Sequence, residues 1–184
     1  MARSAGAGVP VPQVLAPAHV GRTSRESPTL YWFLPETTDL PVEVTVVDPD
    51  GAEPLLERTL AGPVAAGVHG VRLSDHGVRL SAGVEYQWFV SVVVDPARRS
   101  NDVVSGASIR REAPAAALEA VPRQRLAHAH AEAGFWYDAF DQLSTWLVAE
   151  PDAALLHAHR AALLEQVGLD DAARYERERT PEGR

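Results

Sequence analysis

The apolar and polar positions of the chain follow two different patterns, one after the other. Between residues 28 and 112, short runs rich in β-branched and aromatic residues alternate with turn residues, at spacings of roughly 8–15 positions. These runs include PTLYWFLP, VEVTVVD, LLERTLA, GVHGVRL, VEYQWFVSVVVD and DVVSGASIR. Because no helical pattern separates them, they predict an antiparallel β-sandwich.

One segment of this region indicates which kind of β-sandwich to expect. The stretch LSAGVEYQW places Leu80, the turn residue Gly83 and Tyr86 at the start of a long predicted strand. This order is typical of the tyrosine corner of immunoglobulin-like sandwiches. Trp88 follows two positions after Tyr86 and therefore shares its face of the strand, so we expect Trp88 in the sandwich core.

From residue 123 to 184 the apolar period changes to that of helices. Small residues recur here at an interval of 34 positions, which is the period of tetratricopeptide repeats. The recurring pairs are Ala127 and Ala161, Gly134 and Gly168, and Ala139 and Ala173. In such a repeat, the small residues let paired helices approach closely, and the glycine makes the turn between them.

The segment GFWYDAF, residues 134–140, gathers aromatic residues in a chain that otherwise has few. Trp136 and Phe140 fall on one apolar stripe of the predicted helix, and we expect them to pack. Phe135 and Tyr137 fall off that stripe. Either they contact the β part of the chain, or they face a partner.

Together these patterns predict an α+β chain, all-β and then all-α. It consists of an immunoglobulin-like antiparallel β-sandwich followed by a small tetratricopeptide-like helical domain. The predicted parts are a tail or edge strand at 1–27, the sandwich at 28–112, an alanine-rich joint with two prolines at 113–122, and the helices at 123–184.

Composition restricts the partners. The 184 residues are 46% hydrophobic and 23% charged, which are ordinary values for a globular protein. The net charge of −8 disfavours nucleic acid and anionic membranes, because both attract basic proteins. No run of about 18 apolar residues occurs, so we expect no membrane span.

Composition also restricts the chemistry. All 17 basic residues are arginine, and the chain contains no cysteine. The lack of lysine excludes Schiff-base and phosphate-loop lysines. The lack of cysteine excludes thiol nucleophiles and thiolate metal sites.

Four histidines form two pairs, His128 with His130 and His157 with His159. Residues two apart on a helix point about 200° apart, so neither pair can chelate a metal by itself. A site between helices stays open, but His130 falls on an inward repeat position and is expected to be a hydrogen-bonded core residue. We therefore predict no metal site, no cofactor and no catalytic residues, and a protein that is not an enzyme.

The stretch DPARRSNDV, residues 95–103, would connect the long strand to the last one, where sandwiches carry recognition loops. Arg98 and Arg99 offer planar donors for a carboxylate or phosphate. We predict an interaction loop formed by Arg98, Arg99, Ser100 and Asp102. The alternative is that the acidic and hydroxyl side chains bind the arginines inside the loop.

Three segments in the same order resemble the bacterial domain-of-unknown-function family 928. In that family a strand P-T-L-Y-W-Y-L-P is followed by D-P-x-x-R-S-x-D-V, by G-x-I-x-R and by G-x-W-Y-D-A-L at the start of a helix. The matching residues here are Pro28 to Pro35; Asp95, Pro96, Arg99, Ser100, Asp102 and Val103; Gly106, Ile109 and Arg110 or Arg111; and Gly134, Trp136, Tyr137, Asp138, Ala139 and Phe140. The resemblance runs from about residue 14 to 170.

The family has no assigned activity, and its members typically resemble exported proteins, which implies a periplasmic or secreted location. The start of this chain, MARSAGAGVPVPQ, lacks the apolar segment of a signal peptide, which leaves a cytoplasmic location as the alternative. We expect a non-enzymatic protein-interaction or adaptor module of the bacterial envelope. The alternative function is a small-molecule or ion-binding sensor that uses the junction between the two domains.

Overall fold

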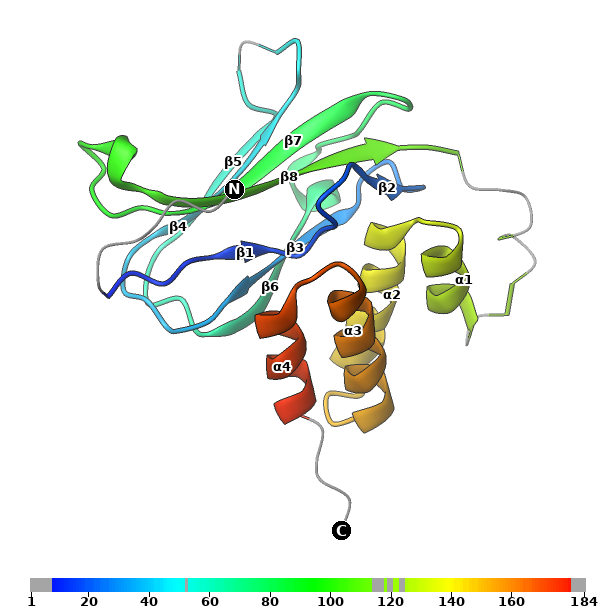
Figure 1. Ribbon diagram of the computed structural model, residues 1–184. Coiled ribbons are helices and arrows are strands. Elements are labelled where there is room, and N and C mark those ends of the chain that lie inside the picture. The colour runs from blue at the N-terminus through cyan, green and yellow to red at the C-terminus, as the bar shows by residue number, and fades with distance from the viewer. Residues whose placement is uncertain (1–7, 52, 114–117, 119–120, 123–124, 180–184) are drawn as a thin grey trace.

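The computed structural model describes residues 8–51, 53–113, 118, 121–122 and 125–179 (Figure 1). Over these residues the β-strands come first and four α-helices follow, so the predicted α+β class is confirmed. Most of the predicted joint at 113–122 lies outside the described residues, as do residues 1–7 and 180–184.

The strands form two sheets. The three-stranded sheet has the order β1-β3-β6, and the five-stranded sheet has the order β2-β8-β7-β4-β5. The bounds are β1 (Gln13–Val14), β2 (Gly21–Thr23), β3 (Thr29–Leu34), β4 (Val42–Val47), β5 (Leu56–Leu60), β6 (Gly67–Arg72), β7 (Glu85–Val92) and β8 (Val103–Arg111).

The core between the sheets follows the period of two that the sequence shows. On β3, Trp32 is 1% exposed, and on β7, Trp88 is 0% exposed. Tyr86 is buried on the same face as Trp88, and its hydroxyl accepts a 3.1 Å hydrogen bond from the backbone N–H of Ser81. This bond ties the start of β7 to the turn that precedes it.

The N-terminal segment departs from the antiparallel pattern that we predicted. The strand β1 pairs antiparallel with β3 in one sheet, but β2 pairs parallel with β8 in the other. The chain crosses between the sheets after Val14, in a stretch that contains Pro17, and it then runs beside β8 in the same direction. The N-terminal segment therefore contributes one short strand to each sheet.

The helices are α1 (Leu126–Glu132), α2 (Trp136–Ala149), α3 (Ala154–Gln166) and α4 (Asp170–Glu178). Gly134 and Gly168 stand between the helices of each pair with φ angles of +78° and +73°, a conformation that glycine adopts without strain. Ala139 and Ala173 are both 0% exposed, which lets the helices approach closely. In the described part of the chain, no helix is long and apolar enough to span a membrane.

Figure 1 shows the helices packed together on one side of the sheets. They cover the outer face of the three-stranded sheet, because the ring of Phe33 on β3 lies 5.2 Å from that of Tyr175 on α4. Tyr31 on β3 likewise makes an edge contact with Phe140 on α2. The predicted packing pair Trp136 and Phe140 stacks at 5.1 Å within α2.

Candidate functional site

Tyr137 joins α2 to the five-stranded sheet. Its hydroxyl accepts a 2.9 Å hydrogen bond from Nε1 of Trp88 and donates a 3.2 Å bond to the carbonyl of Ser108. Burial raises the pKa of Tyr137 well above its usual range, so the phenol stays neutral. Of the two roles that the sequence left open, the structure places Tyr137 at the contact with the β part.

Asp138, the next residue of α2, binds the segment after β2. Its carboxylate is 0% exposed and accepts hydrogen bonds from the Thr23 hydroxyl at 2.6 Å, and from the N–H and hydroxyl of Ser24 at 2.7 and 2.5 Å. These donors replace the water that a buried carboxylate loses. Asp138, a residue of the family motif, therefore fixes α2 to the N-terminal segment.

Asp141 extends this contact by one helical turn. It forms an ion pair with Arg25 and accepts a 2.7 Å hydrogen bond from the hydroxyl of Tyr31. Burial and the Asp141 carboxylate raise the pKa of Tyr31, so this tyrosine also remains a neutral donor. The junction between the sheets and the helices is thus a largely buried polar contact made by three residues in the first turns of α2, Tyr137, Asp138 and Asp141.

A second buried polar cluster lies among the helices. The carboxylate of Glu176 is 0% exposed and forms an ion pair with Arg160 and a 2.7 Å contact with Nδ1 of His157. Nε2 of His157 lies 2.8 Å from the carbonyl oxygen of Pro151, and Arg160 also donates to the hydroxyl of Ser144 at 3.2 Å. These side chains bind one another and hold α2, α3 and α4 together.

The predicted interaction loop contains a short 3₁₀ turn, η2 (Arg99–Asn101). Arg99 donates 2.6 Å bonds to Asp102 and to Glu43 of β4, and these bonds raise the pKa of Arg99 above its already high usual value. Asp102 also accepts a 3.2 Å bond from the N–H of Val94. The structure therefore pairs Arg99 with Asp102 and leaves Arg98 and Ser100 exposed.

The same loop borders a hollow of about 790 Å³ on the outer face of the five-stranded sheet. Its lining includes Arg99, Phe89 of β7 and Gly106 of β8. Phe89 and Gly106 lie directly opposite each other in the pairing of β7 with β8. A Cβ at Gly106 would lie 2.5 Å from Cδ1 of Phe89, so the ring covers the glycine. This leaves a flat, half-buried aromatic surface next to the loop.

A hollow of about 440 Å³, which we call the helical groove, lies between α1, α2 and α3. Buried Leu143 and Leu163 and half-buried Trp146 form its apolar lining. The polar residues of the groove are Arg125, His128, Glu132, His159 and Gln166. His128 and Glu132 face each other at 3.4 Å.

The four helical histidines take different positions. His128 and His159, one from each pair, line the helical groove, while His157 belongs to the buried cluster around Glu176. His130 lies in the core as predicted, but its Nδ1 has no hydrogen-bond partner among the described residues. Burial lowers the pKa of His130. No group of three or more histidines and carboxylates in the described residues could hold a metal ion.

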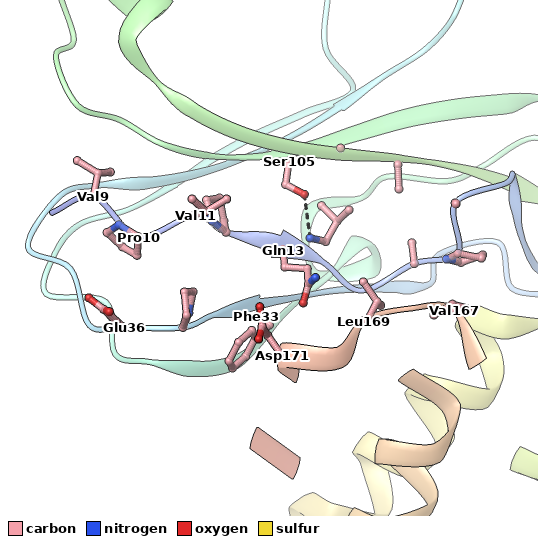
Figure 2. Close-up of a pocket in the computed structure, with 18 of the residues that line it drawn as sticks. Val9, Pro10, Val11, Gln13, Phe33, Glu36, Ser105, Val167, Leu169 and Asp171 are labelled. Atoms are coloured by element: carbon pink, nitrogen blue, oxygen red, sulfur yellow. Dashed lines mark hydrogen bonds between the residues drawn. The ribbon is translucent and has the colours of Figure 1, made fainter. Parts of the chain in front are cut away.

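A third hollow, of about 620 Å³, lies where the N-terminal segment meets the turn between α3 and α4 (Figure 2). We call it the junction hollow, because residues 8–14, 16–18, 33, 35–36 and 105–107 of the β part line it together with Val167, Leu169 and Asp171. The hydroxyl of Ser105 accepts a 3.1 Å bond from the N–H of Val14 and ties β1 across to β8.

Sequence reasoning missed several residues of these sites. Thr23 and Ser24 lie in the segment for which the sequence predicts a tail or edge strand, and Glu43 is a polar position of a strand that the apolar pattern alone predicts. The Thr23–Asp138 bond spans 115 positions of the chain, and no periodic pattern marks a contact of that range. The one available signal is the polar run RTSR at 22–25, which ends three positions before Pro28, the first residue of PTLYWFLP.

Comparisons with known proteins give a family and little more. The family model described as Domain of Unknown Function (DUF928) matches residues 4–176, nearly the whole chain. No curated protein matches. Two solved structures are similar at a TM-score of 0.37: an engineered protein at 15% identity over 59% of this chain, and the E. coli chaperone DraB at 17% identity over 68%. The match spans 21% of the first and 64% of the second.

Proposed function

Because the chain belongs to the family described as Domain of Unknown Function (DUF928), which names no activity, we propose a function from its own surfaces. The protein is a non-enzymatic protein-interaction module of the bacterial envelope, and its helical groove binds a segment of a partner protein. The observation that carries this proposal is the half-buried Trp146 on an apolar groove surface with a polar rim.

The chemistry of the groove indicates the kind of segment that fits. Arg125, the two histidines and Gln166 supply donors, and the single carboxylate of the lining, Glu132, faces His128. A lining with more hydrogen-bond donors than carboxylates is unusual for a chain with a net charge of −8. A partner segment that places an apolar side chain on Trp146 and a carboxylate near Arg125 complements it.

We also propose finer descriptions of the two parts. The order β2-β8-β7-β4-β5 beside β1-β3-β6, with an N-terminal segment shared by both sheets, supports an immunoglobulin-like sandwich. The bond between Ser81 and Tyr86 supports its tyrosine corner. The 34-residue recurrence and the turn glycines support a tetratricopeptide-like helical part.

The hydrogen bonds and ion pairs of four buried carboxylates support a non-enzymatic role. Asp138, Asp141, Asp102 and Glu176 each direct their carboxylates to neighbouring side chains or backbone N–H groups. Their hydrogen bonds hold elements of the fold together. The envelope location rests on the resemblance of the family's members to exported proteins, and fractionation of the native cells tests it.

A substitution that fills the helical groove tests the proposed interaction. Ala162 is exposed on α3 and lines the groove, so Ala162→Arg places a long side chain in it at little cost to the helix. Ala149→Arg is the matched control, because Ala149 is exposed at the end of α2 and does not line the groove. Both variants and the unaltered protein serve as bait in native lysate, and captured proteins are quantified by mass spectrometry.

We expect at least one protein to be captured by the unaltered protein and by Ala149→Arg, and to be reduced about tenfold or more with Ala162→Arg. Equal capture by all three baits would contradict the groove as the binding surface. A second candidate function, small-molecule binding at the junction hollow, is favoured by a different observation, a hollow of about 620 Å³ that both parts of the chain line.

A further inference from the structure

One strand of the five-stranded sheet is paired along only part of its outer edge. Strand β8 pairs with β7 from Val103 to Arg110, but β2 covers its other edge only from Ile109 to Arg111. Among the described residues, no strand pairs with that edge between Val103 and Ser108. The stretch stays open because the N-terminal segment first pairs in the other sheet, as β1, and reaches β8 only with β2.

The register shows which backbone groups face the open edge. The N–H of Glu112 donates to the carbonyl of Thr23 in β2, so every second residue before Glu112 directs its backbone groups to the same side. The carbonyl of Ser108 agrees with this direction. It accepts the hydrogen bond from Tyr137, whose ring lies against Gly21 of β2.

Val104 and Gly106 therefore direct both their N–H and their C=O groups to the open edge, and Ser108 directs its N–H there. None of these groups has a hydrogen-bond partner among the described residues. Gly106 is half-buried, and because glycine has no side chain, its exposed surface belongs to the main chain. The open edge is thus an accessible row of donors and acceptors to which an incoming strand can bond.

The two edges of the sheet differ in their protection. The opposite edge strand, β5, carries the exposed charges Glu57 and Arg58, which disfavour pairing with another strand. Between Val103 and Ile109, β8 carries no charged residue and no proline. Gly106 also lets another backbone approach closely. The edge of β8 is therefore open to pairing, whereas the edge of β5 is protected.

Hollows on both sides of this edge leave space for the side chains of an added strand. The junction hollow and the hollow of about 790 Å³ share Ala18, Gly106 and Ala107 in their linings, so they flank the same stretch of β8. Figure 2 shows Ser105 of β8 directed toward β1 in the junction hollow. Because side chains alternate between the faces of a strand, successive residues of an added strand enter the two hollows in turn.

The walls of the larger hollow indicate a single segment as the occupant. Residues 18–20, which precede β2, line one end of it, and Arg99 and Ser100, which precede β8, line the other. A single extended segment fits between these walls, whereas the whole sheet of a second copy would meet them.

The charges of the two hollows indicate the side chains of that segment. In the larger hollow, Phe89 provides apolar surface, and Arg99 is already paired with two carboxylates, which favours apolar side chains. In the junction hollow the charged lining residues are Glu36 and Asp171, which favours basic side chains. The complementary segment alternates apolar and basic residues.

We propose that the open edge of β8 binds such an extended segment of a partner protein by β-strand addition. The segment bonds to the backbone of Val104, Gly106 and Ser108, and directs its apolar side chains toward Phe89. Residues 103–108 span roughly 20 Å at about 3.3 Å per residue, so a segment of about five to seven residues covers the edge. This surface is separate from the helical groove, and the inference does not rest on the groove.

The first experiment measures amide hydrogen exchange of the protein alone by NMR. The amides of Val104 and Gly106 should exchange at least about tenfold faster than those of Ser105 and Ala107, which point to β7. Equal protection of the four amides would overturn the proposal, because the edge would then be covered.

The second experiment adds a probe peptide, acetyl-GVRVRVG-amide, to the isotope-labelled protein. Binding should slow exchange of the Val104 and Gly106 amides by about tenfold or more and leave those of Ser105 and Ala107 unchanged. A peptide in which glutamate replaces both arginines should bind at least about threefold more weakly. No binding of the probe up to about 1 mM, or equal binding of the acidic peptide, would overturn the proposal.

Two N-methylated forms of the probe test for backbone pairing on the unaltered protein. The N–H groups of the valines point to β8 if the segment is antiparallel, and those of the arginines do so if it is parallel. Methylation of one set should therefore weaken binding about tenfold or more relative to methylation of the other set. Equal affinities of the two forms would contradict strand addition.

The third experiment removes a donor from the edge. Val104→Pro deletes an N–H that points away from β7, a change that edge strands tolerate, and should weaken the probe about fivefold or more. Thr59→Pro is the matched control on β5. Val46 accepts a bond from Leu55 and pairs with Leu56, so residues 56, 58 and 60 bond to β4, and Thr59 directs its N–H away from β4.

Equal effects of Val104→Pro and Thr59→Pro would overturn the proposal, and if Val104→Pro does not fold, the N-methylated pair still decides. Ala162→Arg should leave binding of the probe unchanged. A protein that binds the probe at β8 but loses no partner with Ala162→Arg would contradict the proposed role of the helical groove alone, so the two failures are distinguishable.

Discussion

Nε1 of Trp88 donates a 2.9 Å hydrogen bond to the hydroxyl of Tyr137, and this bond links the core between the sheets to helix α2. Both side chains are at most 1% exposed. The bond satisfies the one polar atom of a tryptophan that is otherwise surrounded by apolar side chains, and the same tyrosine hydroxyl donates onward to β8. Helix α2 is therefore part of the core that the sheets form.

Tyr137→Phe should destabilise the protein by about 1–3 kcal/mol, because it leaves Nε1 of Trp88 buried without an acceptor. Urea unfolding followed by tryptophan fluorescence measures the change. Tyr175→Phe is the control: its hydroxyl accepts a bond from the exposed Arg179, so its loss should cost under about 0.5 kcal/mol. Equal losses of stability in the two variants would show that the buried bond from Trp88 contributes no more than the exposed bond from Arg179.

Asp138→Asn tests the contact between α2 and the segment after β2. The amide keeps the shape of the side chain but turns a donor toward Thr23 or Ser24, which themselves donate to this position. We expect a loss of about 2–3 kcal/mol, the range for hydrogen bonds to a charged group. Asp152→Asn, at an exposed position between α2 and α3, should be close to neutral, and a comparable loss there would contradict this explanation.

The two turn glycines form a matched pair for a third test. Both have positive φ angles, so alanine at either position should cost about 1–2 kcal/mol. A Cβ at Gly134 would also lie 2.1 Å from Nη2 of Arg22, which donates to the carbonyl of Ala133, whereas nothing lies within 4 Å of a Cβ at Gly168. Thermal unfolding should therefore show a larger loss for Gly134→Ala than for Gly168→Ala, and the opposite order would contradict the Arg22 contact.

The predictable features of this fold are those that repeat locally. The period of two in VEYQWFVSVVVD indicates which face of β7 is buried, and the recurrence of Gly134 at Gly168 indicates where helices turn. Both patterns arise because neighbouring residues share one environment. They establish the α+β class and the buried position of Trp88.

The candidate sites depend on single contacts between distant segments, and these have no such signature. Gln13 and Asp171 line the same hollow because β1 lies beside the α3–α4 turn, which follows from the docking of the helices on the three-stranded sheet. Glu43 meets Arg99 because β4 lies next to β7. The family motif marked Arg99, Tyr137 and Asp138 as a set, but geometry alone shows which partners they bind.

The loop after β7 allows a comparison of adjacent arginines. Arg99→Ala leaves the nearly buried carboxylates of Glu43 and Asp102 without their shared cation, so we expect a loss of about 1–2 kcal/mol, reduced from the cost of a fully buried pair because Arg99 is 49% exposed. Arg98→Ala should change stability by less than about 0.5 kcal/mol. Urea unfolding at low and high salt measures both. Unfolding of Arg98→Ala with full stability of Arg99→Ala would reverse the assignment.

The last prediction concerns His130 and pH. Burial lowers the pKa of His130 in the folded protein, aided by Arg25 and opposed by Asp138, while the unfolded chain keeps a histidine pKa of about 6.5. Well above pH 6.5 both states hold a neutral imidazole. As the pH falls below about 6.5, His130 binds a proton in the unfolded state but not in the folded state. The free energy of unfolding therefore decreases until the pH reaches the folded-state pKa of His130.

His130→Gln removes this titration and should flatten the pH dependence of unfolding between about pH 7.5 and 5.5, even if the substitution lowers stability at both values. Urea unfolding at each pH gives the difference for each variant, which separates the titration from the packing change. His76→Gln, at an exposed position after β6, is the control for replacing a histidine by glutamine. An unchanged slope in His130→Gln would mean that this histidine is protonated equally in the folded and unfolded states.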